Sequence, residues 1–99
     1  MLQIDKNIES VKALCRKHKV EKLYLFGSAT NGSFTDKSDI DFLVSFDKDD
    51  LNQYFTNYIS FKKKLGKLFK REIDLVEEQT LKNPILINSI NKNKELIYG

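Results

Sequence analysis

Residues 23–46, with the sequence LYLFGSATNGSFTDKSDIDFLVSF, decide how the rest of the chain is organised. An apolar run ends at Gly27 and Ser28, small polar residues follow, and Asp39 and Asp41 open a second run in which polar and apolar residues alternate. Alternation with a period of two is typical of a β-strand, and small polar residues between two such runs are typical of a turn. The stretch therefore predicts two strands joined by a polar turn, with two carboxylates near the start of the second strand.

The flanking residues predict helices and strands that support this pair. Apolar residues at helical spacing over residues 4–15 indicate one amphipathic helix, and those over residues 51–69 indicate a longer one. Residues 72–76 indicate a third strand, and residues 95–98 indicate a short edge strand. Pro84 opens another helix, in which Leu86, Ile87 and Ile90 are expected to face inward. Because a helix joins the second and third strands, we expect them in one sheet through a crossover connection. The predicted fold class is α/β (α+β), a small mixed β-sheet of about four strands with helices packed against it.

Length and composition set limits on the kind of protein. The 99 residues predict a single domain spanning residues 1–99, and the net charge of +3 is mild. Neither a signal peptide nor an apolar run long enough for a membrane helix is visible, and the single Cys15 fits a reducing compartment. We therefore expect a cytoplasmic protein with no membrane partner.

The remaining charged and reactive side chains have ordinary explanations. Lysines at positions 62–70 mostly lie away from the apolar stripe of their helix, which indicates a solvated face rather than a nucleic-acid surface. His18 is interpreted as a cation at a helix end, and Cys15 as a core residue. The short strand at residues 95–98 is an edge that leaves a homo-oligomer open.

Three carboxylates carry the strongest chemical signal in the chain. Asp39 and Asp41 project from one face of a strand, with Cα atoms about 6.5–7 Å apart. That spacing lets both reach a pair of metal ions about 3.5–4 Å apart, with Asp74 on the next strand as a third ligand. Ligands that are all oxygen favour Mg²⁺, or Mn²⁺, over zinc. Two acidic residues on a solvated strand, or a glycine after a strand, would each mean little alone, so the joint pattern is what predicts a metal site.

The segment LFGSATNGSFTDKSDIDFLV resembles the signature of the nucleotidyltransferase superfamily typified by DNA polymerase beta. In that signature, an apolar residue, a glycine and a glycine or serine precede a strand that carries two acidic residues two positions apart. Within the superfamily, the chain is similar to minimal nucleotidyltransferases, small domains that occur as antitoxins beside HEPN-domain toxins. The resemblance runs from the first helix to the final ELIYG segment and implies the nucleotidyltransferase fold.

The resemblance also implies a role for each matching residue. Gly27 and Ser28 match the pair that holds the β and γ phosphates of the nucleotide. Asp39 and Asp41 match the carboxylates that bind both Mg²⁺ ions. Asp74 matches the third carboxylate, which binds the catalytic metal and can accept the proton of the incoming hydroxyl. ATP would be the substrate, and a hydroxyl would attack its α-phosphate with release of pyrophosphate.

For the acceptor, the resemblance implies a tyrosine of a cognate HEPN ribonuclease toxin, which the transfer of AMP would neutralise. Asn31 leaves an alternative open, because many minimal members carry an arginine there that can hold a triphosphate bidentately. In this alternative, the domain is a non-catalytic antitoxin that neutralises the HEPN partner by direct contact. Transfer to a small-molecule acceptor is a third hypothesis, less favoured because the chain leaves no room for a domain that would hold such an acceptor.

Overall fold

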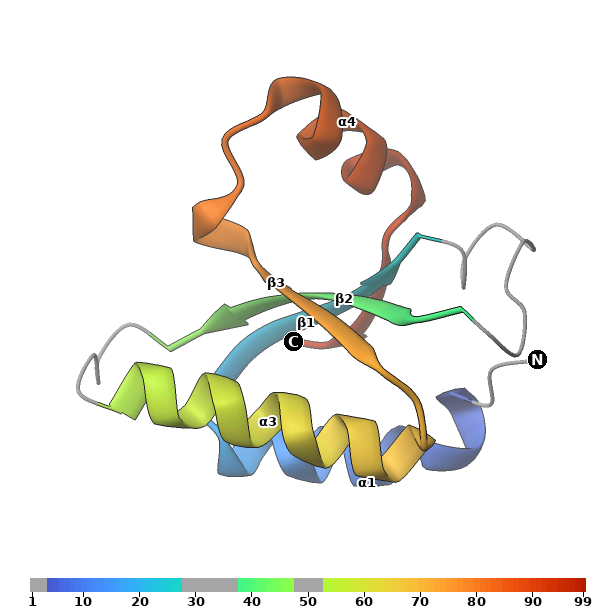
Figure 1. The fold of residues 1–99 in the computed structure, drawn as a ribbon, viewed down its shortest axis with the longest axis vertical. Helices are drawn as coiled ribbons and strands as arrows, with labels where there is room; N and C mark the ends of the chain where they lie inside the picture. The colour runs from blue at the N-terminus through green and yellow to red at the C-terminus, as the bar shows by residue number, and fades with distance from the viewer. Residues whose placement is uncertain (1–3, 28–37, 48–52) are drawn as a thin grey trace.

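The computed structural model describes residues 4–27, 38–47 and 53–99, and Figure 1 shows how they are arranged. Helices and strands follow one another in the predicted order. They are α1 (Ile4–Lys17), β1 (Val20–Phe26), β2 (Ile40–Phe46), α3 (Tyr54–Phe69), β3 (Ile73–Glu77), the 3-10 helix η2 (Glu78–Thr80), α4 (Pro84–Asn93) and β4 (Glu95–Tyr98). Within these described ranges, no helix has both the length and the apolar character needed to cross a membrane.

The four strands form one mixed sheet in the order β3-β2-β1-β4. β1 pairs antiparallel with both β2 and β4, whereas β2 pairs parallel with β3. A parallel pair requires a long connection between its strands, and α3 supplies it by crossing from the end of β2 to the start of β3. The predicted fold class, mixed sheet and crossover are therefore confirmed.

Helices α1 and α3 lie side by side against one face of the sheet, and α4 lies on the opposite side (Figure 1). The alternation of residues along β2 explains why α1 and α3 pack on this face of the sheet. The even-numbered residues of β2 are apolar and are buried toward these two helices. Phe46, at the end of that row, packs on Tyr54 and Phe61 of α3, with ring centroids 5.4 and 6.2 Å away. The Tyr58 hydroxyl donates to the Leu75 carbonyl and so ties α3 to β3.

His18, which was predicted as a cation at a helix end, lies directly after α1 but is buried there. It is 3% exposed, with Nδ1 at 2.8 Å from the Leu14 carbonyl oxygen and Nε2 at 3.0 Å from the Ser60 hydroxyl. A carbonyl oxygen only accepts, so Nδ1 donates to it, and in the neutral ring Nε2 accepts from the serine. His18 therefore links the end of α1 to α3. Cys15, one turn earlier, is fully buried in the core as predicted.

The helix α4 begins as predicted but is buried over a shorter stretch. The Asn83 side chain caps it by accepting hydrogen bonds from the N–H groups of Ile85 and Leu86, at 3.0 and 3.5 Å. Ile90 is 3% exposed, but Leu86, which was predicted to face inward, is 45% exposed. The prediction for Leu86 is wrong because the side of α4 that meets the sheet carries Ile87 and Ile90, which line a cavity with Leu43.

Candidate active site

Asp41 and Asp74 lie opposite each other on adjacent parallel strands. Their Cα atoms are register partners in the β2–β3 pairing, so the two side chains leave the same face of the sheet. Asp39 lies immediately before β2 and is exposed, as is Asp74, whereas Asp41 is half-buried. The structure therefore brings two of the three predicted carboxylates, Asp41 and Asp74, together in register. The third, Asp39, lies just before the start of β2.

Burial, and after it the neighbouring carboxylates, change how Asp41 titrates. The pKa of Asp41 is raised from 3.8 to about 6. The causes, largest first, are burial, the charge of Asp74, a hydrogen bond to the Asp74 side chain, and the charge of Asp39. A hydrogen bond between two carboxyl groups requires that one of them carries a proton. Negative charge is thus concentrated at this end of β2 and β3, and a cation bound there would favour the ionised form of Asp41.

Gly27 is the described member of the predicted phosphate-binding pair, and it lies against Asp41. It follows Phe26, which is the register partner of Asp41 in the antiparallel pairing of β1 with β2. Its φ of +76° is in the left-handed region, and a Cβ placed on it would lie 3.1 Å from Cγ of Asp41 and nearer still to Oδ2. Glycine is therefore required at this turn both by the backbone conformation and by the adjacent carboxylate.

The segment that carries Asp39 is held by residues that sequence reasoning missed. The Arg71 guanidinium donates to the Ser38 carbonyl at 3.0 Å, and the Ile40 N–H donates to the Glu72 carbonyl at 3.1 Å. Both bonds join the start of β2 to the residues that lead into β3. The only sequence signal was the position of Arg71 just before the predicted third strand, which does not by itself indicate a contact with residue 38.

The donor chemistry of these residues fits a hard divalent cation. Asp39, Asp41 and Asp74 offer carboxylate oxygens only, which are the ligands that Mg²⁺ and Mn²⁺ prefer. In the parts of the chain that the structure describes, no three acidic, histidine or cysteine side chains converge as a ready-made metal site. Asp39, two residues before Asp41 and exposed, would be the third member of a three-carboxylate set. Ser28 and Asn31, which were predicted to bear on the triphosphate, lie outside the described residues.

Comparison with known proteins identifies the family. Residues 9–99 match the family described as Polymerase beta, Nucleotidyltransferase. The chain belongs to this nucleotidyltransferase family. The predicted resemblance and the predicted enzyme class are therefore confirmed.

Relatives of this nucleotidyltransferase match it over almost its whole length. It is 34% identical over 103 residues to the "Putative protein adenylyltransferase MJ1379" of Methanocaldococcus jannaschii, covering 94% of this chain and 98% of that one. A solved structure described as a "putative minimal nucleotidyltransferase" superposes with a TM-score of 0.77 at 26% identity, covering 93% of this chain and 90% of the other. A toxin–antitoxin crystal structure with AMP-PNP superposes with a TM-score of 0.72 at 25% identity, covering 94% of this chain and 73% of that chain.

Proposed function

We propose that this nucleotidyltransferase is an antitoxin that transfers AMP from ATP to a tyrosine of a cognate HEPN ribonuclease toxin. The observation that carries the proposal is the in-register pair Asp41 and Asp74 beside Gly27, in a chain of this family. A fold gains no stability from placing two like charges together, so the arrangement is best explained by a bound cation. The similarity to a protein adenylyltransferase and to a toxin–antitoxin structure supports the choice of nucleotide and partner.

The proposed roles follow from where the residues lie. Asp39, Asp41 and Asp74 would hold two Mg²⁺ ions, which in such sites stabilise the attacking and leaving oxygens of an in-line displacement. Gly27 and Ser28 would present backbone N–H groups to the β and γ phosphates. Asp74 would accept the phenolic proton as the tyrosine oxygen bonds to the α-phosphorus and the bond from that phosphorus to pyrophosphate breaks. We place the reaction in the cytoplasm, where the buried Cys15 thiol would stay reduced.

The test is the intact mass of the partner. The purified chain is incubated with Mg²⁺, ATP and the HEPN protein encoded beside it, and the mass of that protein is measured before and after. We expect whole AMP units to be added, and we expect Asp41→Asn and Asp74→Asn to abolish the addition. Asp47→Asn, which changes an exposed carboxylate at the other end of β2, is the matched control and should leave the mass increase intact.

The result also distinguishes the alternative, a non-catalytic antitoxin, to which Asn31 points. If the toxin is neutralised with no change in mass, and Asp41→Asn protects as well as the parent, transfer of AMP is wrong and direct contact is the mechanism. Transfer of AMP to a small molecule, with the mass of the HEPN protein unchanged, would contradict both the proposed transfer and the direct-contact alternative.

A further inference from the structure

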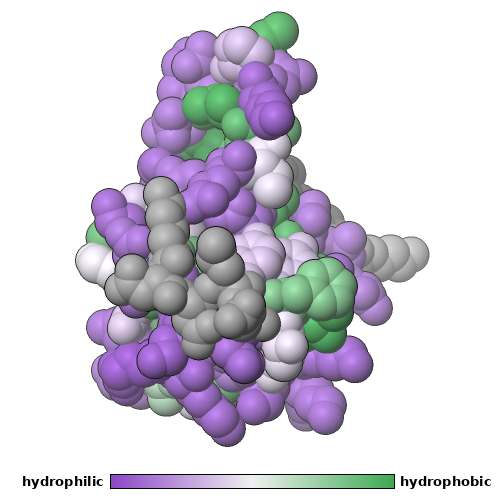
Figure 2. Space-filling model, turned by 90° about the vertical axis from the view of Figure 1, so that its left-hand side faces the viewer, coloured by the Kyte–Doolittle hydropathy of each residue, from purple (hydrophilic) through white to green (hydrophobic). Residues whose placement is uncertain are grey.

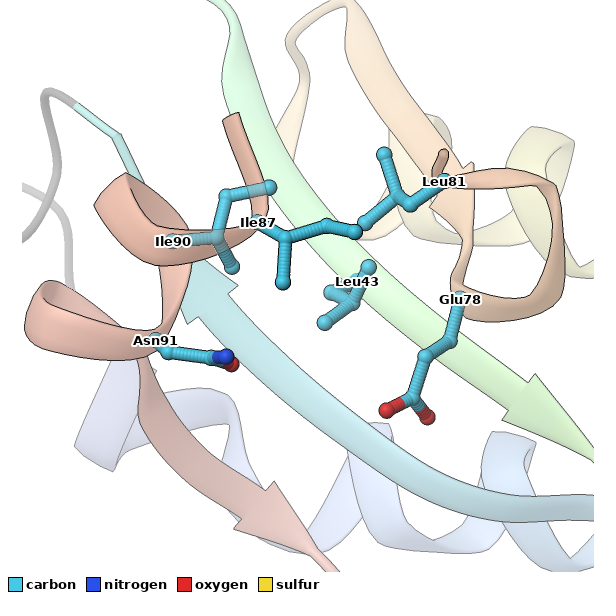
Figure 3. Close-up of a pocket in the computed structure, with 6 residues that line it drawn as sticks. All are labelled: Leu43, Glu78, Leu81, Ile87, Ile90 and Asn91. Carbon is cyan, nitrogen blue, oxygen red and sulfur yellow. The ribbon is translucent and has the colours of Figure 1, made fainter. Parts of the chain in front are cut away.

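A cavity of about 230 Å³ lies between the sheet and α4, on the face of the sheet that carries Asp41 and Asp74. Figure 3 shows its residues, which come from β2, from the η2 region and from α4. They are Leu43, Glu78, Leu81, Ile87, Ile90 and Asn91. Leu43 forms the wall on the sheet side, and Ile87 and Ile90 form the wall on the helix side (Figure 3). The cavity is thus a slot between two apolar walls.

The cavity and the candidate active site lie on the same face of β2. Leu43 is two residues after Asp41, so both side chains leave the same face of the strand, with Cα atoms about 6.5–7 Å apart. Register supports the same placement on β3, because Asp74 is opposite Asp41 and Val76 is opposite Leu43. A nucleotide whose α-phosphate lies at the carboxylates could therefore reach the cavity through its ribose.

The size and lining of the cavity fit one planar ring system. At about 230 Å³ it exceeds the space of a few waters, and it is smaller than the pockets that enclose whole drug-sized ligands. Its two polar residues, Glu78 and Asn91, lie away from the apolar walls (Figure 3). An asparagine amide can pair with the N6 and N7 edge of adenine, and a glutamate can accept from an exocyclic amino group.

We propose that this cavity binds the adenine of the nucleotide substrate, with Leu43 and Ile87 against its faces and Asn91 on its N6/N7 edge. The inference rests on the proposed function, and it adds the basis of nucleotide preference. The walls supply affinity for any base, whereas Asn91 supplies the preference for adenine over a pyrimidine.

The first test fills the cavity. Ile87→Trp places a large side chain in the slot, and Ile85→Trp, on the same helix but 80% exposed, is the matched control. Binding of Mg-ATP and of Mg-tripolyphosphate, which has no base, is measured by calorimetry for each variant. We expect Ile87→Trp to weaken Mg-ATP about tenfold or more and to leave Mg-tripolyphosphate unchanged. Retained tripolyphosphate binding shows that the variant is folded, and Ile85→Trp should match the parent with both ligands.

The second test changes the polar edge. Asn91→Leu keeps the size of the side chain but removes its donor and acceptor, and Asn88→Leu, at an exposed position one turn earlier, is the control. The ratio of Mg-ATP to Mg-CTP affinity should fall about tenfold in Asn91→Leu and stay at the parent value in Asn88→Leu.

Failure of this inference is distinguishable from failure of the proposed function. If the parent binds Mg-ATP no better than Mg-tripolyphosphate and Ile87→Trp changes neither, the cavity is not a base site, while the proposed transfer stands. If Ile87→Trp instead abolishes binding of the HEPN protein with nucleotide affinity intact, the cavity receives a side chain of the partner. If the parent binds neither phosphate ligand, both proposals are overturned.

Discussion

At the scale of single residues, the candidate site depends on the close contact between Gly27 and Asp41, which leaves no space for a side chain at position 27. Gly27 combines a left-handed backbone with a carboxylate where a Cβ would be. Asp41 is half-buried between two other carboxylates, and Gly27 allows the chain to turn without displacing it. The geometry of the acidic pair and that of the turn are therefore set together.

Gly27→Ala should be destabilising for two reasons. Alanine in the left-handed region costs about 1–2 kcal/mol, and its methyl group must also displace the Asp41 carboxylate. We expect a lower urea midpoint for unfolding and weaker binding of Mg-ATP. A midpoint equal to that of the parent would show that the turn can adopt another conformation.

The titration of Asp41 should make stability depend on pH in metal-free buffer. Its pKa is about 6 in the folded chain against 3.8 ordinarily, so between these values the folded state binds more protons than the unfolded state. The unfolding free energy is thus higher near pH 4 and falls as the pH rises through about 6. Because water screens the half-buried group, we expect a change of about 1 kcal/mol rather than the full value of the shift.

Asp41→Asn isolates this contribution. It should match the parent near pH 4, where Asp41 is protonated, and exceed it in stability at pH 7.5, as measured by urea denaturation with a chelator present. Asp47→Asn should show no such divergence. Greater stability of the parent at pH 7.5 would mean that ionised Asp41 has a favourable partner.

At the scale of elements, the fold could be predicted well from the sequence where local pattern and packing agree. The alternation in β2 and the helical stripe that includes Phe61 and Leu65 identify their elements and their buried faces. His18 and Leu86 could not be predicted, because their burial depends on tertiary neighbours: Ser60 on another helix, and the angle at which α4 approaches the sheet. For the same reason, the contact of Arg71 with Ser38 and the cavity under α4 were invisible in the sequence.

The hydrogen bond between His18 and Ser60 should contribute to the docking of α1 on α3. Ser60→Ala removes the partner of a buried ring nitrogen, so we expect a loss of about 1–2 kcal/mol in unfolding free energy. Thr56→Ala, one turn earlier at an exposed position on α3, is the control and should cost less than about 0.5 kcal/mol. Equal effects of the two changes would contradict a specific role for the bond.

At the scale of the whole molecule, Cys15 can report opening of the core. It is fully buried, and burial raises the pKa of its thiol to about 12. A thiol reagent at pH 8 should react at least about 100-fold more slowly with the native chain than with the chain in urea. Ala13→Cys adds an exposed thiol on the same helix, which should react quickly while Cys15 stays protected. Equally fast reaction of both would show that α1 opens locally.

The parallel pairing of β2 with β3 has a consequence for the order in which the chain folds. β1 and β2 are neighbours in sequence, whereas β2 and β3 can pair only after the whole of α3 has closed the loop between them. Asp41 and Asp74 repel as that loop closes, so we expect their pairing to form after the transition state. A divalent cation held by both would then slow unfolding and leave the refolding rate nearly unchanged, which stopped-flow measurements with and without Mg²⁺ can test. The sheet would thus form first, and the bound metal would stabilise the finished sheet kinetically by slowing its unfolding.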